Sequence, residues 1–210
     1  MQHVHAACPD ATVIFDVGAN LGGWTIAANK LWPQAEIHAF EPSPGVLAHL
    51  RAATAHLPVK CVACGLSDET RSSVLYRVPG HPALSSVHQR DLGAHGLSMS
   101  LSEEILLRTI DDYCGENGVE YIDFLKIDAE GHDLSVLRGA KAMLAAGSIQ
   151  TIQFEFGGAN IDSRTYLRDF VALLTPRYRI SRIVAGGLES LQYSEREEIF
   201  VTANFLAERN

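Results

Sequence analysis

Short apolar runs rich in β-branched residues alternate along the chain with stretches whose apolar residues recur at helical spacing. This alternation predicts an α/β fold, in which mostly parallel strands form one sheet with helices on both faces. The predicted strands are Thr12–Val17, Ala35–Phe40, Val59–Cys64, Tyr121–Ile127 and Ile149–Phe156. The predicted helices are Gly22–Trp32, Ser43–His56, Leu134–Ala146 and Ser163–Thr175.

The last two predicted strands, Tyr178–Val184 and Ile199–Phe205, have no helical pattern between them. The loop that joins them contains Gly186 and Gly187, which are typical of tight turns. We therefore expect an antiparallel hairpin at one edge of the sheet.

The periodic pattern weakens between Ser67 and Arg108, where glycine, proline and serine are frequent. A long irregular loop in an α/β domain usually acts as a lid or a binding loop. Ser86 and His88 are the substrate-binding candidates there, with an ordinary surface role as the alternative. No linker or repeat divides the chain, so residues 1–210 are expected to form a single domain.

The composition favours a protein that acts on a small molecule. The net charge of −8 disfavours nucleic acid and anionic membranes as partners, and no apolar run approaches the roughly 20 residues of a membrane span. The N-terminal residues do not resemble a signal peptide. Cys61 and Cys64 form a C-x-x-C pair, but their place in a predicted strand favours free thiols over a zinc site. These features predict a cytoplasmic protein.

The clearest motif is the glycine-rich turn from Asp16 to Gly22, between the first predicted strand and the helix that follows. It departs from the dinucleotide fingerprint because Asn20 stands where that pattern has glycine. A carboxylate at Asp16 would repel a pyrophosphate and attract an ammonium group. The pattern therefore favours a ligand with a cationic end and no phosphates.

A second acid, Glu41, ends the second predicted strand and follows Asp16 by 25 residues. An acid in this position can accept hydrogen bonds from both hydroxyls of a ribose. Taken separately, Glu41 could be a solvated loop acid and Asp16 a helix cap. Their equivalent places at two strand ends favour a nucleoside-binding site.

Three blocks together resemble the FkbM-type methyltransferases: Asp16-Val-Gly-Ala-Asn-Leu-Gly, Phe40-Glu-Pro-Ser-Pro, and Phe124-Leu-Lys-Ile-Asp-Ala-Glu-Gly-His-Asp. Thr109-Ile-Asp-Asp-Tyr also fits that family's pattern. The resemblance covers about Val13 to Phe156, and its most specific part is Lys-Ile-Asp-x-Glu-Gly. It implies a Rossmann-like class I methyltransferase with a seven-stranded sheet and a C-terminal antiparallel hairpin.

The resemblance also implies S-adenosylmethionine as the methyl donor and O-methylation of a sugar, glycolipid or natural product. Its motifs imply that the methionine end of the cofactor meets the first turn, and that the ribose and the adenine meet later strand ends. The implied cofactor-binding residues are Asp16, Gly18, Asn20, Gly22, Glu41, Ser67 and Asp68. The family often has asparagine just before the adenine stretch, where this chain has Ala63.

Ionisable residues are dense between Lys126 and Asp133, where a predicted strand passes into a helix. Because a positioned base must remove the proton of the acceptor hydroxyl, Asp128, Glu130 and His132 are the catalytic candidates. Asp128 is preferred, with Lys126 keeping it ionised. Solvated caps and surface ion pairs are the alternative for this cluster.

Glu155, near the end of the next predicted strand, is a further substrate-binding candidate. Together with Asp128 it could hold Mg²⁺, which prefers oxygen ligands, but two carboxylates favour a metal-free site. A nicotinamide-dependent oxidoreductase and a non-catalytic nucleoside-binding module remain the alternatives. A homodimer is an open expectation.

Overall fold

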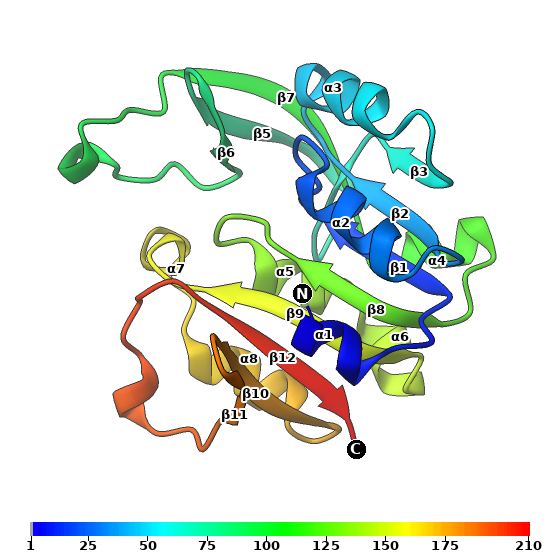
Figure 1. Cartoon of the computed structure of the whole chain (residues 1–210). Coiled ribbons are helices and arrows are strands. Elements are labelled where there is room, and N and C mark those ends of the chain that lie inside the picture. The colour runs from blue at the N-terminus through cyan, green and yellow to red at the C-terminus, as the bar shows by residue number, and fades with distance from the viewer. Residues whose placement is uncertain (1) are drawn as a thin grey trace.

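The central sheet follows the order β11-β10-β12-β9-β8-β1-β2-β3 in a computed structural model that describes residues 2–210 (Figure 1). The strands β1, β2, β3, β8 and β9 are parallel, and β12 is antiparallel to both of its neighbours. Their bounds are β1 Val13–Val17, β2 Glu36–Phe40, β3 Val59–Val62, β8 Ile122–Ile127, β9 Ile149–Phe156, β10 Tyr178–Val184, β11 Gly187–Ser190 and β12 Ala203–Arg209. The predicted fold class, a mostly parallel α/β sheet, is confirmed.

Helices cover both faces of this sheet, as the alternating pattern predicts. Buried residues of α4, α5, α6 and α8 form one apolar core with the strands, and those of α1 and α2 form another on the opposite face. The bounds are α1 Gln2–Ala7, α2 Gly23–Leu31, α3 Pro44–Thr54, α4 Ile110–Asn117, α5 Asp133–Arg138, α6 Lys141–Ala146, α7 Ala159–Ser163 and α8 Leu167–Leu174. Among the described residues, no helix has the length and apolar character to cross a membrane.

Two predicted helices differ from their predicted bounds. The span Leu134–Ala146 divides into α5 and α6 at Gly139, whose carbonyl accepts a 3.0 Å hydrogen bond from the N–H of Asp111 and whose backbone packs against Ser67. The predicted helix Ser163–Thr175 begins later, as α8 at Leu167, and its first residue ends α7, where Arg164 has a φ of 55°.

The C-terminal hairpin differs from its prediction in detail. Gly187 begins β11, a short edge strand that pairs with β10, so the sheet has eight strands instead of seven within residues 2–210. The final strand pairs antiparallel with β10 as expected, but it lies between β10 and β9, and it begins at Ala203. Phe200, with a φ of 50°, lies outside the extended conformation that the predicted strand Ile199–Phe205 required.

The segment 67–108 was predicted as an irregular loop, and this prediction is wrong. It contains most of a second sheet in the order β4-β7-β5-β6, with bounds β4 Gly65–Leu66, β5 Arg71–Val78, β6 His81–Ser86 and β7 Leu101–Arg108. Leu75, Ile105 and Leu107 form its own small apolar core. Figure 1 shows this second sheet above the carboxyl ends of the central strands. The predicted strand Val59–Cys64 ends at Val62, and the chain then passes into β4.

Candidate active site

A cavity of about 330 Å³ lies where the carboxyl ends of β1, β2 and β8 face the second sheet. The ends of parallel strands at the centre of an open α/β sheet are the usual place for a ligand, and this volume suits a small molecule. One wall consists of strand-end residues of the central sheet, and the other consists of apolar residues of the second sheet. The second wall contains Leu66, Leu75, Pro82, Val87, Ile105 and Leu107.

The turn after β1 is shaped by Gly18, which has a φ of 74°. Its N–H donates a hydrogen bond to the carbonyl of Phe40, at 3.1 Å, which ties the ends of β1 and β2 together. A Cβ at this position would lie 2.0 Å from the carbonyl oxygen of Asp128. Only glycine therefore lets the ends of β1 and β8 approach so closely.

Glu41 holds the turn from the other side. Its carboxylate accepts hydrogen bonds from the N–H of Asn20 at 3.0 Å and from the N–H of Ser43 at 2.9 Å. Burial raises the pKa of Glu41, while these two backbone hydrogen bonds act in the opposite direction. Glu41 and Asn20 both line the cavity, so the turn and this acid form one end of it.

Asp16 is fully buried and does not line the cavity. Its carboxylate accepts a 2.6 Å hydrogen bond from Thr25 and lies 3.0 Å from the ammonium of Lys126. Lys126 also lies 3.7 Å from Asp128, and it donates to the carbonyl of Gly18 at 3.2 Å. Burial lowers the pKa of Lys126, but the nearby carboxylates of Asp16 and Asp128 outweigh it and leave the pKa raised. The lysine therefore stays charged at the base of the cavity.

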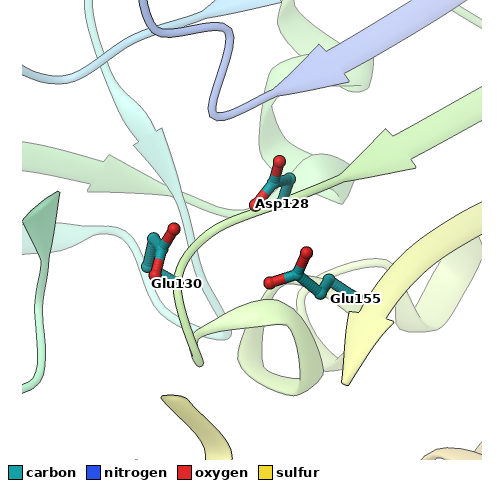
Figure 2. A group of neighbouring side chains, drawn as sticks. All are labelled: Asp128, Glu130 and Glu155. Atoms are coloured by element: carbon teal, nitrogen blue, oxygen red, sulfur yellow. The ribbon is translucent and has the colours of Figure 1, made fainter. Parts of the chain in front are cut away.

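Three carboxylates converge beside this lysine (Figure 2). One oxygen each of Asp128, Glu130 and Glu155 lies within 4.8 Å of the others. Asp128 and Glu130 line the cavity, whereas Glu155 lies behind them at the end of β9. Oxygen ligands in this number match the preference of a divalent cation, but two protein cations already lie beside the group. These are Lys126 next to Asp128, and Arg90, which forms an ion pair with Glu130.

The crowding of acids changes their proton affinity. Burial, together with the nearby charge of Asp128, raises the pKa of Glu155 to about 8. Burial also raises the pKa of Glu130 to about 7, although the Arg90 guanidinium acts in the opposite direction. Two of the three acids therefore titrate near neutral pH.

His132 lies on the wall of the cavity, and both of its ring nitrogens have partners. Its Nε2 is 2.9 Å from the hydroxyl of Ser67, and its Nδ1 is 3.2 Å from Nε2 of His88. Because the Ser67 hydroxyl donates to Asp68, His132 must donate to Ser67 and accept from His88. Burial and the neighbouring His88 lower the pKa of His132 to about 4. A neutral histidine with both nitrogens engaged has no free lone pair to act as the predicted general base.

The structure thus brings about half of the predicted site residues to the cavity. Those that line it are Gly18, Asn20, Glu41, Ser86, Asp128, Glu130 and His132. Those that support it from behind are Asp16, Gly22, Ser67, Asp68, His88 and Glu155. Ser67, expected with Asp68 near an adenine, bonds to both His132 and Asp68. The sequence did not reveal the apolar wall, because its strands were taken for a loop.

The central sheet, with a site at the ends of its parallel strands and the antiparallel β12 between β9 and β10, has the Rossmann-like fold of the class I methyltransferases. A model of the "Methyltransferase FkbM domain" matches residues 16–178, and the chain belongs to that family of methyltransferases. Similar curated proteins include the 31-O-demethyl-FK506 methyltransferase FkbM of Streptomyces tacrolimicus, which is 32% identical in an alignment that covers 61% of this chain and 59% of the relative. Another is the 2-O-methyltransferase NoeI of Sinorhizobium fredii, 27% identical over 63% of this chain and 58% of the relative. The chain spans between 58% and 62% of the length of four such relatives.

Solved structures agree on the fold. The methyltransferase FkbM from Methylobacillus flagellatus superposes with a TM-score of 0.58 and 16% identity, over 94% of this chain and 44% of that one. SMU.1697c, a methyltransferase from Streptococcus mutans in complex with SAH, superposes with a TM-score of 0.55 and 11% identity, over 100% of this chain and 94% of that one. At these identities the likeness concerns the fold alone.

Proposed function

We propose that this methyltransferase uses S-adenosylmethionine to methylate a hydroxyl group of a small molecule. The observation that carries the proposal is the cavity itself. It has a backbone turn and Glu41 at one end, an apolar wall at the second sheet, and the acids Asp128 and Glu130 beside them. These surfaces together suit S-adenosylmethionine, with its amino-acid end, ribose and purine ring, and leave a place for methyl transfer within the same cavity.

The cavity favours a cation over a phosphate. Glu41, Asp128 and Glu130 line it, and Lys126 is the one basic side chain besides His132 among its lining residues. In the sequence, the charge of Asp16 suggested a cationic ligand, but Asp16 is enclosed with Lys126. The acids that would attract a cation are therefore those on the cavity wall. The negative charge of these acids attracts a sulfonium and an ammonium group, whereas it repels the pyrophosphate of a nicotinamide cofactor.

The apolar wall suits the purine ring. Pro42 follows Glu41 directly, and Leu66 and Leu107 lie on neighbouring strands of the second sheet. A ribose bound by Glu41 would direct its base toward these side chains. The residues proposed to contact the adenine are therefore Pro42, Leu66 and Leu107, with Ser67 and Asp68 shaping the wall from behind.

Asp128 is the proposed general base. Its side chain lines the cavity and is 42% exposed, so an acceptor hydroxyl can reach it, unlike the enclosed Asp16. The bound cofactor supplies the electrophilic methyl group, and the protein must hold the hydroxyl in line with it. Asp128 accepts the hydroxyl proton as the carbon–oxygen bond forms, and the ammonium of Lys126 lies 3.7 Å from its carboxylate. The proposed acceptor is a hydroxyl of a sugar, glycolipid or natural product, and the names of two relatives, a 31-O-demethyl-FK506 methyltransferase and a 2-O-methyltransferase, support O-methylation.

Calorimetry with S-adenosylmethionine, S-adenosylhomocysteine and NADH tests the cofactor. We expect micromolar binding of the first two and none of NADH, and the reverse result would overturn the proposal in favour of an oxidoreductase. S-adenosylhomocysteine release with a panel of sugar and macrolide alcohols tests the reaction. D128N should retain cofactor binding and lose about 10²–10⁴-fold in turnover, as expected for a missing base.

A further inference from the structure

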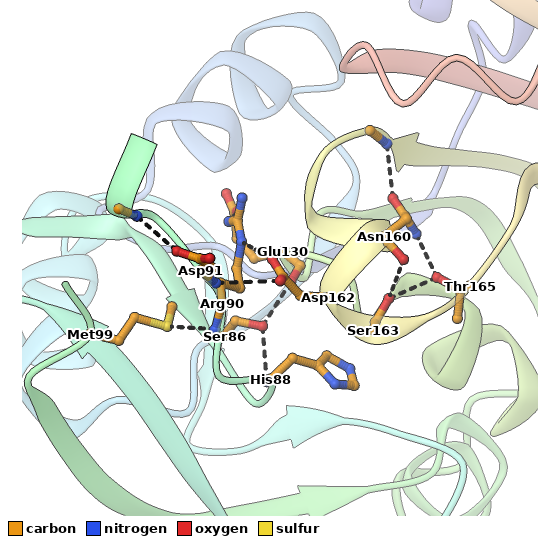
Figure 3. A network of polar contacts seen from close by, with 12 residues as sticks. Ser86, His88, Arg90, Asp91, Met99, Glu130, Asn160, Asp162, Ser163 and Thr165 are labelled. Carbon is orange, nitrogen blue, oxygen red and sulfur yellow. Dashed lines mark hydrogen bonds and ion pairs between the residues drawn. The ribbon is translucent and has the colours of Figure 1, made fainter. Parts of the chain in front are cut away.

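Arg90 connects the second sheet to the acidic side of the cavity (Figure 3). It follows β6 in the chain, and its guanidinium forms an ion pair with Glu130, which follows β8. Its side chain is only 11% exposed. The contact therefore joins two segments that are 40 residues apart in sequence, inside a largely dry environment.

Asp162 holds Arg90 from the other side. Its carboxylate in α7 lies 3.7 Å from Nε of Arg90, and the same side chain accepts a hydrogen bond from the N–H of Asp91 at 3.3 Å. The N–H of Arg90 also donates to the sulfur of Met99, at 3.3 Å. Apart from Glu130, Arg90 is thus held by a hydrogen bond from its backbone N–H and by the ion pair of its side chain with Asp162.

The backbone of Glu130 is fixed as well. Its φ of 50° lies in the left-handed region, and its carbonyl accepts a 2.8 Å hydrogen bond from the hydroxyl of Ser86. The next residue, Gly131, packs against α7, where an added Cβ would lie 2.7 Å from the carbonyl oxygen of Ala159. Three elements therefore meet at Glu130, whose carboxylate lies on the cavity wall.

We propose that Arg90 and Asp162 are positioning residues that hold the Glu130 carboxylate, ionised, against the sulfonium side of the cavity. This inference rests on the proposed use of S-adenosylmethionine. It assigns a role in the site to two residues outside the methyltransferase motifs described above.

The charges around Glu130 support this role. Asp128 and Glu155 face it from the ends of β8 and β9 and disfavour its ionisation, while Lys126 and Arg90 favour it. Burial and the charge of Asp128 raise the pKa of Glu130 to about 7 even with Arg90 lowering it, so removal of the guanidinium would raise this pKa further and favour the uncharged acid near neutral pH. A negative charge on Glu130 would attract the sulfonium of S-adenosylmethionine much more strongly than the uncharged thioether of S-adenosylhomocysteine.

A double-mutant cycle on ligand binding tests the inference without an identified acceptor. Calorimetry at pH 7.5 measures S-adenosylmethionine and S-adenosylhomocysteine on the wild type, R90M, E130Q and the double variant. We expect E130Q and R90M each to weaken S-adenosylmethionine binding about tenfold and S-adenosylhomocysteine binding less than twofold. The double variant should bind S-adenosylmethionine no more weakly than either single variant, because Arg90 acts through Glu130.

Two further variants separate positioning from folding. R90K keeps the positive charge and should bind S-adenosylmethionine more tightly than R90M does. D162N should also weaken S-adenosylmethionine binding, by a smaller factor than R90M. R182M is the matched control, since Arg182 forms a comparable 2.8 Å ion pair with Glu197, and it should leave both affinities unchanged. Independent losses that multiply to about a hundredfold, or equal losses for both ligands, would overturn the inference. If the wild type binds neither ligand, the proposed function itself fails.

Discussion

Asp16 and Lys126 form an ion pair of 3.0 Å beneath the floor of the cavity, where β1 and β8 lie side by side. The two side chains are 0% and 5% exposed. Removing one partner of a buried pair leaves the other charge without compensation. We expect D16N to lower the free energy of unfolding by about 3–5 kcal/mol, measured by urea denaturation.

The double variant D16N/K126M is the control for that result. If the loss comes from an unpaired ammonium, removing the lysine as well should restore part of the stability. A double variant less stable than D16N would show instead that packing, and not charge, explains the loss.

At Gly18 the backbone leaves no room for a side chain. An added methyl group would overlap the carbonyl of Asp128 and would also require a positive φ. G18A should therefore cost about 1–3 kcal/mol of stability through overpacking. It should also weaken S-adenosylhomocysteine binding at least tenfold in calorimetry, because the turn that lines the cavity must move.

Gly45 offers a matched comparison, since nothing lies within 4 Å of a Cβ added there. It is in α3, away from the cavity, so G45A should stay within about 1 kcal/mol of the wild type and bind normally. Equal effects of the two substitutions would contradict the close approach of β1 and β8.

His132 should make stability depend on pH in the acidic range. Its pKa is lowered from 6.5 to about 4 in the folded protein, so only the unfolded chain takes up a proton between these values. Stability therefore falls as the pH drops from about 6.5 to about 4, by up to roughly 3 kcal/mol. Urea denaturation at several pH values in this range gives the free energy of unfolding as a function of pH. This free energy should change less steeply with pH for H132Q than for the wild type, while H49Q, at an exposed position, should keep the wild-type dependence.

Glu155 should act in the opposite direction at higher pH. Its pKa is raised from 4.5 to about 8, so the folded protein retains a proton that the unfolded chain releases. This acid therefore costs stability progressively as the pH rises from about 4.5 to about 8. E155Q should gain stability relative to the wild type at pH 8.5 and lose that advantage at pH 5, and an unchanged difference would show that Glu155 is not the titrating group.

Divalent cations should have little effect on cofactor binding. Arg90 and Lys126 already supply positive charge beside Glu130 and Asp128, so a metal ion would compete with them. Titrations of S-adenosylmethionine with EDTA and with Mg²⁺ should give affinities within twofold of each other. A magnesium-dependent gain that E155Q abolishes would establish a metal site in place of a metal-free one.

The sequence predicted the central sheet well because its buried strands are short continuous apolar runs separated by helical patterns. The strand ends at Asp16, Glu41 and Asp128 could be placed together for the same reason, since parallel strands end at one edge. Their orientation could not be predicted, because it depends on the enclosed contact between Asp16 and Lys126.

The second sheet was missed because its strands look polar. In β5 only Leu75 and Val78 are buried, and Arg71, Ser72 and Ser73 give no clear alternation. Such strands are defined by their partners rather than by their own pattern. The link from Arg90 to Glu130 was invisible for the same reason, because it depends on where that sheet docks.

The edge position of β6 has a consequence for how this enzyme could diversify. Within residues 2–210, β6 pairs only with β5 and has no strand on its other side, yet its residues and Val87 form part of the cavity wall. Insertions or deletions there would disturb few backbone hydrogen bonds, whereas β1 is held between β2 and β8. Evolution or protein engineering can thus lengthen or shorten this strand and reshape one wall of the cavity while the central sheet keeps its pairing.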